Sequence, residues 1–127
     1  MSLIDAQTLH EQQDQATLID IRQPGEFRLD GHLDASTNIA AYDWQHGFYT
    51  PREEFAEEVL EVCDPADRIV LLCADGRLSV GARSVLESHA FTDVSVLDGG
   101  LNEWQAEELP GFVVDEDGEG GLVGAWV

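Results

Sequence analysis

The sequence predicts an α/β fold with a central, mostly parallel sheet of about five strands and helices on both faces. Short apolar, β-branched runs alternate with helical patterns along most of the chain, which is typical of βαβ units. Residues 68–72 (RIVLL) are almost continuously apolar, as expected of a central strand that is buried on both faces. The 127 residues correspond to one domain, and a chain of this length can bury a core without disulfides or metals.

Four elements are predicted in the amino-terminal third of the chain. Residues 5–13 show a modest helical pattern, and residues 17–21 form a short β-branched run that predicts a buried strand. Pro24 suits the first turn of a short helix, where its missing N–H is not needed. Residues 37–40 predict a further short strand.

The middle of the chain predicts a loop and then a helix. Residues 42–50 (YDWQHGFYT) are rich in aromatic side chains and are expected to form a loop. Pro51 then opens a predicted helix over residues 52–62, whose apolar side chains recur at helical spacing. Asp64-Pro65 is expected to end this helix.

The elements after the central strand repeat the alternation of helix and strand. A loop that contains Gly76 leads into a predicted helix from about Ser79 to His89. Residues 94–97 predict the next strand, and Asp98-Gly99-Gly100 turns into a short helix that carries Trp104.

The last segment differs in composition from the rest. Residues 115–121 (DEDGEGG) are acidic and Gly-rich, which favours flexibility. The chain then ends in an apolar stretch, residues 122–127, which could dock on its own domain or on a partner. The sequence thus predicts a domain over residues 1–110 and a tail over residues 111–127.

The charge balance is unusual for a globular domain. There are 26 acidic residues and six basic ones, all of them Arg, so the formal net charge is −20. Such a domain repels itself at low ionic strength, and molar salt removes most of this repulsion by shrinking the screening length to ~3 Å. The composition favours a protein of a salt-accumulating halophile over a merely acidic mesophilic protein. Binding to nucleic acid or to anionic membranes is disfavoured, because both need a basic patch.

The cysteines and the amino terminus favour a reducing cytoplasm. No apolar run approaches the ~20 residues that span a bilayer, and residues 1–5 lack the features of a secretory signal. Cys63 and Cys73 form neither a CxxC pair nor a zinc-ligand spacing, so no metal or organic cofactor is expected. A reducing cytosol also disfavours a disulfide between them. Cys63 suits a packing role better than that of a resolving thiol.

Cys73 carries the strongest chemical signal. It stands at the carboxyl end of the predicted central strand, where ligands bind in open α/β sheets. The loop that follows runs into a helix, so its backbone N–H groups can form an anion cradle that favours a thiolate. Gly76 tolerates the tight curvature, and Ser79 is expected to cap the helix. Taken alone, the pattern is equally compatible with a buried, inert cysteine.

Three segments in order resemble the rhodanese family. Residues 20–27 (DIRQPGEF) with the following Gly31-His32-Leu33 are similar to its D-x-R…E-[FY]…G-H-[IL] pattern. Residues 70–79 resemble its active-site cysteine and six-residue loop, and residues 97–104 (LDGGLNEW) resemble its closing L-x-G-G…W segment. The resemblance covers about residues 2–110. It implies a parallel sheet with helices on both sides and a ping-pong sulfur transfer through Cys73.

The loop departs from the family's common C-x-x-G-x-R-S pattern. Arg77 comes one position early, and Leu78 occupies the usual arginine position. Asp75 is also present, and an acid beside the cradle opposes an anionic donor such as thiosulfate. Residues 31–36 (GHLDAS) likewise differ from the frequent G-H-I-P-G-A. Phosphatases and arsenate reductases of this fold carry Arg at the end of a C-x5-R loop. That position is Ser79 here, which argues against both activities.

Other polar residues are better explained by structure than by chemistry. Asp20, Arg22 and Glu26 could act as acid–base groups, but in the family such residues mostly hold the first loop through ion pairs and hydrogen bonds. His32 follows a glycine in a turn and is expected to be structural. The remaining histidines are scattered along the sequence, which argues against a metal site: His10, His46 and His89.

The residues and the resemblance together predict a sulfurtransferase that carries sulfane sulfur as a persulfide on Cys73. A small donor such as thiosulfate would supply the sulfur, and a thiol, a protein thiol or cyanide would accept it. Arg77 would steer the anion. The predicted substrate-binding residues are Ala74, Asp75, Gly76, Arg77, Leu78 and Ser79.

The alternative prediction is a non-catalytic rhodanese-like module with a binding or regulatory role. It would use the aromatic segment, in which Trp44, Phe48 and Tyr49 either form a rim over the active site or cap the edge of the core.

Overall fold

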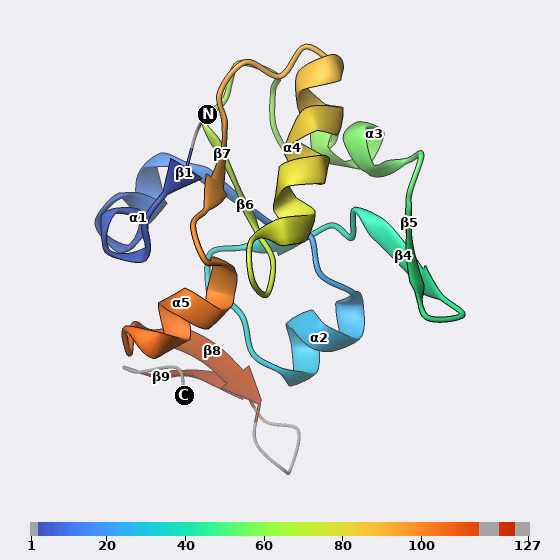
Figure 1. Cartoon of the computed structure of the whole chain (residues 1–127). Coiled ribbons are helices and arrows are strands. Elements are labelled where there is room, and N and C mark those ends of the chain that lie inside the picture. The colour runs from blue at the N-terminus through green and yellow to red at the C-terminus, as the bar shows by residue number, and fades with distance from the viewer. Residues whose placement is uncertain (1–2, 115–119, 124–127) are drawn as a thin grey trace.

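The computed structural model describes residues 3–114 and 120–123, and a five-stranded sheet forms its centre (Figure 1). Neighbouring strands lie in the order β1-β7-β6-β2-β3, and each of these pairs is parallel. The predicted α/β fold class is therefore confirmed. The strands are β1 (Leu3–Ile4), β2 (Thr17–Asp20), β3 (Thr37–Asn38), β6 (Ile69–Leu72) and β7 (Val94–Leu97).

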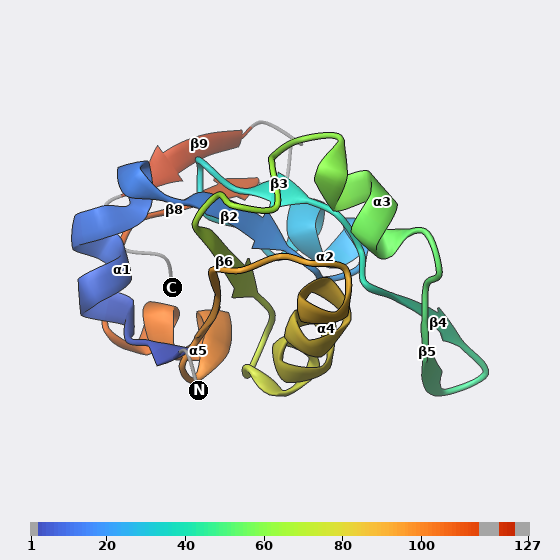
Figure 2. The same ribbon diagram turned by 90° about the horizontal axis from the view of Figure 1, so that it is seen from above.

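Helices cover both faces of the sheet (Figure 2). Helices α1 (Ala6–Gln12) and α5 (Gly100–Ala106) pack on one face, and α3 (Phe55–Leu60) and α4 (Arg77–Ser88) pack on the other. Alternate residues of β6 enter the two layers, as the pleat of a strand requires. Ile69 and Leu71 contact the α3/α4 layer, whereas Val70 and Leu72 contact the α1/α5 layer. All four side chains are fully buried, as predicted for the central strand.

The first strand is absent from the sequence prediction. β1 contains two residues, too few to show a period of two, and it is defined by its pairing with β7. Asp5 follows it directly and caps α1, since its carboxylate accepts the Thr8 N–H at 2.8 Å. A short 3-10 turn (Gln13–Gln15) then leads into β2.

The aromatic segment is a β-hairpin and not the expected loop. β4 (Tyr42–Gln45) pairs antiparallel with β5 (Phe48–Pro51), and the hairpin projects from the body of the molecule (Figures 1 and 2). The connecting residues His46 and Gly47 have φ of 53° and 82°, the conformation of a two-residue hairpin turn. Trp44 and Tyr49 pair across the strands with ring centroids 4.6 Å apart, which stabilises the pairing.

The helix after the hairpin is shorter than predicted. Pro51 belongs to β5, and α3 begins at Phe55 rather than at Arg52. The Arg52 N–H donates to the Ala41 carbonyl at 3.0 Å, and the guanidinium bonds the Ala40 carbonyl and Glu58. These contacts engage Arg52 outside the helix.

The helix after Cys73 begins earlier than predicted. α4 starts at Arg77, and its cap is Gly76, whose φ is +92°. Ser79 therefore lies inside the first turn, and the predicted capping role is wrong. Its Oγ is fully buried and has no hydrogen-bond partner among the described residues.

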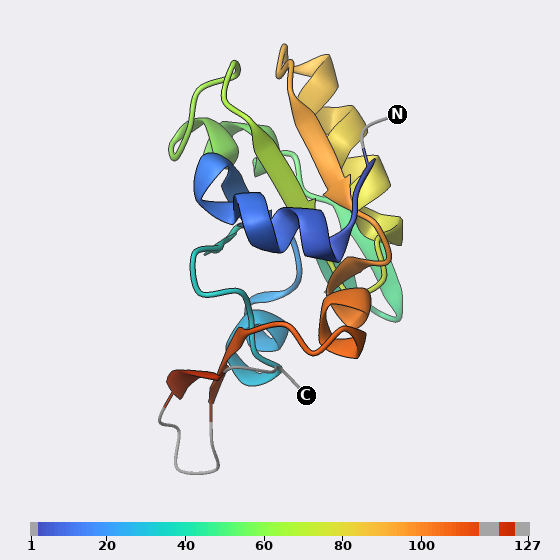
Figure 3. The same cartoon turned by 90° about the vertical axis from the view of Figure 1, so that its left-hand side faces the viewer.

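A second hairpin lies at the carboxyl end of the described chain. Helix α2 (Pro24–Leu29) begins at its proline as predicted, and β8 (Gly111–Val114) lies beside it (Figures 1 and 3). β8 pairs antiparallel with β9 (Gly120–Val123), so residues 120–121 of the segment expected to be flexible are in a strand. Residues 115–119 and 124–127 lie outside the described residues, as does most of the apolar end expected to dock. The domain boundary at residue 110 stays a prediction.

Candidate active site

Cys73 lies directly after β6, at the edge of the sheet where the carboxyl ends of β2, β6 and β7 meet. Its side chain is 2% exposed, and its Sγ accepts the Gly76 N–H at 3.1 Å. The positive φ of Gly76 turns the chain so that this N–H points back at the sulfur. A hydrogen bond donated to the sulfur stabilises negative charge on it.

The amino end of α5 supports the backbone of the cysteine loop. The N–H groups of Leu101 and Asn102 donate to the carbonyls of Cys73 and Ala74, both at 2.8 Å. Gly100 makes this approach possible, because a Cβ there would lie 2.6 Å from both carbonyl oxygens. Gly100 also has a φ of +64°, which disfavours any other residue. The sequence pointed to this glycine through the predicted Asp98-Gly99-Gly100 turn and through the family motif, but not through its contact with the cysteine loop.

A cavity of about 280 Å³ opens beside Cys73. Four of the predicted loop residues form part of its wall, namely Ala74, Asp75, Arg77 and Leu78. Gly76 contacts the sulfur through its N–H, whereas Ser79 is buried in α4 outside the wall. The assignment of these residues to substrate binding stays a prediction. The rest of the wall consists of Ile21, Arg22, Gln23, Glu26, Tyr42 and Tyr49.

Arg77 and Asp75 neutralise each other at the mouth of the cavity. The Arg77 Nε lies 3.5 Å from the Asp75 Oδ2, and the Arg77 N–H donates to the Asp75 Oδ1 at 3.0 Å. The Arg77 side chain is 89% exposed, so this ion pair contributes little to stability. It nevertheless reduces the positive charge that Arg77 presents to an anion, and it engages one backbone N–H of the predicted cradle.

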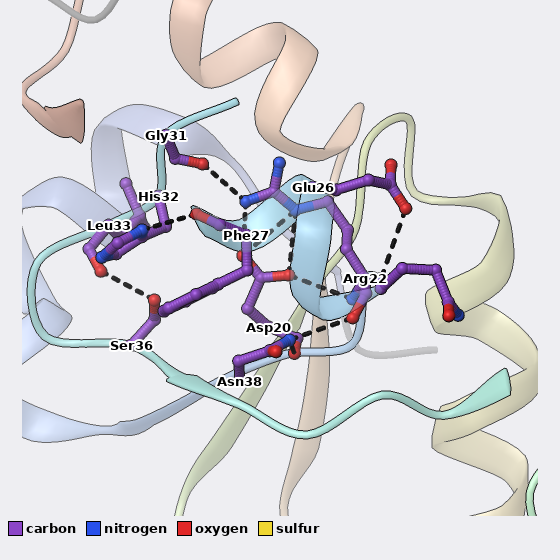
Figure 4. Close-up of polar contacts among 10 residues, drawn as sticks. Asp20, Arg22, Glu26, Phe27, Gly31, His32, Leu33, Ser36 and Asn38 are labelled. Atoms are coloured by element: carbon purple, nitrogen blue, oxygen red, sulfur yellow. Dashed lines mark hydrogen bonds and ion pairs between the residues drawn. The ribbon is translucent and has the colours of Figure 1, made fainter. Parts of the chain in front are cut away.

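Asp20 and Arg22 form a buried ion pair beside α2 (Figure 4). The Arg22 Nη2 lies 2.7 Å from the Asp20 Oδ2 and also donates to the Gly31 carbonyl at 2.8 Å. Asn38 donates to the carbonyls of Asp20 and Arg22, at 2.9 Å each. These bonds tie the end of β2 to the loop after α2, which supports the structural interpretation of Asp20 and Arg22.

Glu26 and two tyrosines, Tyr42 and Tyr49, also line the cavity. The Glu26 Oε1 accepts the Gln23 N–H at 3.3 Å (Figure 4), and the Tyr42 hydroxyl donates to the Leu78 carbonyl at 3.1 Å. Burial raises the pKa of Tyr42 and of Tyr49, and the charge of Cys73 adds to both shifts. Glu26 and Asp75 raise the pKa of Tyr49 further, so this phenol stands among acidic groups.

The aromatic segment thus contributes to the site. Tyr49 lines the cavity, whereas Trp44 and Phe48 are exposed at 53% and 72% and lie outside its wall. The expected rim over the active site is thus supported for Tyr49, and the exposure of Trp44 and Phe48 argues against a cap on the core edge. The sequence prediction missed Tyr42, which has no motif around it. Its position in the wall depends on the hairpin.

The second cysteine and the histidines lie outside this chemistry. Cys63 is half-buried against the α3/α4 core, and its Sγ donates to the Val59 carbonyl at 3.4 Å. Burial raises the pKa of the Cys63 thiol, and Asp67 and Asp64 add to the shift, which suits packing. The His32 ring stacks on Phe27 with centroids 3.8 Å apart. Within residues 3–114 and 120–123, no three His, Cys, Asp or Glu side chains are grouped to hold a metal, and no helix there is long and apolar enough to cross a membrane.

Comparison with known families finds a match over most of the chain. The family model of the rhodanese-like domain matches residues 5–107. A rhodanese-related protein from Thermoplasma volcanium, solved by crystallography, superposes with a TM-score of 0.68 at 25% identity, over 87% of this chain and 97% of that one.

Curated relatives include sulfurtransferases. Thiosulfate:glutathione sulfurtransferase of Saccharomyces cerevisiae is 28% identical over 88 residues, 68% of this chain and 63% of the relative. Rhodanese-like domain-containing protein 17 of Arabidopsis thaliana is 30% identical over 99 residues, 74% of this chain and 61% of the relative. The chain thus spans less than two thirds of the length of these two proteins. Thiosulfate sulfurtransferase GlpE of Vibrio cholerae is 30% identical over 105 residues, 83% of this chain and 86% of the relative.

Proposed function

The chain belongs to the rhodanese-like domain family, and we propose that it is a sulfurtransferase that carries sulfane sulfur as a persulfide on Cys73. One observation carries the proposal. The Cys73 Sγ follows the central strand, adjoins a cavity and accepts the Gly76 N–H at 3.1 Å. A buried inert cysteine needs neither the cavity nor the donor. The names of the yeast and Vibrio cholerae relatives support the same class of reaction.

In the first step, the Cys73 thiolate attacks the sulfane sulfur of a donor such as thiosulfate. A bond forms between the Cys73 Sγ and this sulfur, the S–S bond of the donor breaks, and sulfite leaves with the electron pair. The persulfide keeps the negative charge. The Gly76 N–H would stabilise this charge, together with those other backbone N–H groups of residues 74–79 that Asp75 does not engage.

In the second step, an acceptor takes the outer sulfur. A thiolate attacks that sulfur and becomes a persulfide, or cyanide attacks it and becomes thiocyanate. The bond between the two sulfurs of the persulfide breaks, and Cys73 leaves as a thiolate. No metal, organic cofactor or external oxidant is consumed, so the proposed partners are a small sulfur donor and a thiol or protein-thiol acceptor.

Intact-protein mass spectrometry tests the proposal. After incubation with thiosulfate and removal of the excess, the protein should gain the mass of one sulfur atom. The Cys73→Ser variant should lose this gain and all transfer to cyanide, whereas Cys63→Ser should retain most of both. A Cys73→Ser variant that still transfers sulfur would overturn the assignment of the nucleophile.

A non-catalytic binding module is the second candidate, and the exposed aromatic hairpin favours it. Trp44, Phe48 and Tyr49 are all at least 43% exposed, which is typical of a surface that meets a partner. No sulfur gain on Cys73 with thiosulfate, with polysulfide or with a small-molecule persulfide would favour this candidate over the enzyme.

We also propose a reducing, salt-rich cytoplasm as the working environment. Cys73 must be a free thiol to act, and Cys63 and Cys73 are both unpaired. The net charge of −20 suits high ionic strength, because salt screens the repulsion between the acidic side chains.

A further inference from the structure

The charged groups in the wall of the Cys73 cavity leave one acid without a cation. Arg22 pairs with Asp20, and Arg77 pairs with Asp75. Glu26 also lines the cavity, and no basic side chain among the described residues forms an ion pair with it. The lining side chains include two arginines and two acids, and with the buried Asp20 counted against Arg22 this group of five carries one net negative charge.

Glu26 closes the capping box of α2 with one carboxylate oxygen and leaves the other for a second group. It is half-buried in α2, and its Oε1 accepts the Gln23 N–H at 3.3 Å (Figure 4). This bond is at the long end of the range for N–H···O and uses one of the two carboxylate oxygens. The remaining capacity of the carboxylate is available to a ligand, since an ionised carboxylate accepts at about four positions.

An aromatic ring accompanies this carboxylate. Tyr49 lines the same cavity from the hairpin, and Glu26, Asp75 and Cys73 all act electrostatically on its hydroxyl. A carboxylate beside an aromatic ring favours a cation, because the carboxylate supplies charge and the ring supplies its electron-rich face. The same pair opposes an anion.

We propose that Glu26 and Tyr49 recognise a positively charged group on the sulfur acceptor, so that the preferred acceptor is a thiol with an ammonium or guanidinium group near its sulfur. The inference rests on the proposed sulfur transfer and names the acceptor class for it. Two sources share this chemistry: a small aminothiol, and a cysteine flanked by basic residues in a polypeptide. In either case the cation lies against Glu26 while the acceptor thiolate attacks the outer sulfur of the Cys73 persulfide.

Three small thiols of similar size test the inference: cysteamine, 2-mercaptoethanol and 3-mercaptopropionate, which are cationic, neutral and anionic. The protein is first loaded with sulfur, and loading is verified by mass. Transfer rates are then compared between wild type and Glu26→Gln, so that the intrinsic reactivity of each thiol cancels. Glu26→Gln keeps the shape and the acceptor for the Gln23 N–H.

We expect Glu26→Gln to lower kcat/KM for cysteamine by about three- to tenfold. The kcat/KM for 2-mercaptoethanol should stay within about twofold of the wild-type value, and that for 3-mercaptopropionate should rise severalfold. Glu57→Gln is the matched control. Glu57 is exposed on α3 outside the cavity, and its loss changes the net charge equally. Tyr49→Leu should also weaken the preference for cysteamine, while Tyr49→Phe should retain it, because the ring contacts the cation.

The outcomes separate this inference from the proposed function. If Cys73 does not load with sulfur, the proposed function fails. If Cys73 loads and transfers sulfur, but Glu26→Gln changes kcat/KM by the same factor for all three thiols, the acceptor inference fails and the proposed function stands. Peptides with a cysteine between two lysines or between two glutamates distinguish the sources. If Glu26→Gln lowers kcat/KM more for the lysine peptide than for cysteamine, the acceptor is a polypeptide. If it lowers kcat/KM more for cysteamine, the acceptor is a small aminothiol.

Discussion

Asp75 stands two residues after the nucleophile, and its carboxylate bonds both the N–H and the guanidinium of Arg77. Asp75→Asn removes the charge but keeps an oxygen for the Arg77 N–H. We expect this variant to use thiosulfate better by severalfold, because the Arg77 charge is then no longer offset. The gain should be largest at low salt, since the screening length falls from ~10 Å at 0.1 M to ~3 Å at 1 M. Steady-state transfer to cyanide measures it.

Arg77→Ala in the Asp75→Asn background is the control for this prediction. If the freed guanidinium causes the improved use of thiosulfate, the double variant should use thiosulfate no better than wild type. An Asp75→Asn variant with unchanged thiosulfate use at every salt concentration would contradict the role given to Asp75.

Ser79 allows a second prediction at this scale. A serine that capped α4 would cost about 0.5–2 kcal/mol when replaced by alanine. Its hydroxyl is instead fully buried and without a partner among the described residues, a situation that costs roughly 1–3 kcal/mol. We therefore expect Ser79→Ala to leave the free energy of unfolding unchanged or to raise it by about 1 kcal/mol. Urea denaturation of wild type and Ser79→Ala measures the difference in the free energy of unfolding. A clear loss of stability in the variant would restore the capping role.

These residues show what local sequence can reveal about a site. Cys73 was predictable, because its neighbours in the chain carry the strand, the loop and the motif. Ser79 was placed wrongly, because the true cap depends on the positive φ of Gly76, three residues before the predicted start of the helix. Tyr42 and Glu26 reach the cavity from segments distant in sequence, so no local pattern identifies them together.

At the scale of elements, the site depends most on α5, whose amino end contacts the cysteine loop. Gly100→Ala would place a methyl group 2.6 Å from the carbonyl oxygens of Cys73 and Ala74, at a φ of +64°. We expect a loss of about 1–3 kcal/mol in the free energy of unfolding from the backbone strain, and more from the clash. Sulfur loading should fall with it, since the Gly76 N–H and the Cys73 Sγ would shift apart.

Gly25→Ala is the matched control for this substitution. Gly25 lies in α2, and an added Cβ there would meet nothing within 4 Å. Alanine in a helix is favoured over glycine by about 0.8–1 kcal/mol, so this variant should be as stable as wild type or more so. Equal effects of the two substitutions would show that the Gly100 contact is not special.

The hairpin docks on α4 through one tyrosine. The Tyr42 hydroxyl donates to the Leu78 carbonyl, and a Cβ at Gly81 would come within 2.5 Å of that hydroxyl. We expect Gly81→Ala to displace Tyr42 and to reduce sulfur transfer, even though alanine favours the helix. In the Tyr42→Phe background the same substitution should be tolerated, because the clashing oxygen is gone. If the effects of Gly81→Ala and Tyr42→Phe on sulfur transfer were additive, the two residues would not interact, and the predicted clash would be wrong.

Element prediction succeeded where the pattern was long enough. The central strand and the following helix carry clear periods, and both were found, with the helix start two residues off. The β4–β5 hairpin was missed because its register depends on a His-Gly turn with positive φ at both residues. β1 was missed because two residues form a strand only by pairing with β7.

At the scale of the whole molecule, charge is the property that the fold must accommodate. The chain carries 26 acidic residues against six arginines. Five ion pairs occur among the described residues, and one of them, between Asp20 and Arg22, is buried. Most carboxylates therefore repel one another across the surface, and this repulsion destabilises the compact state.

We therefore expect potassium chloride to raise the thermal midpoint by several degrees between 0.1 M and 1 M, because the shorter screening length removes the repulsion. Circular dichroism measures the midpoint. Chloride is preferred to sulfate, since sulfate strengthens apolar burial by its exclusion from the surface. A variant in which the exposed Glu11, Glu53 and Glu57 become glutamine has three fewer negative charges at unchanged shape. Its thermal midpoint at 0.1 M salt should be higher than that of wild type, and the rise between 0.1 M and 1 M should be smaller. Equal salt gains in both proteins would mean that chloride acts through burial or a bound ion and that the acidic surface does not limit stability.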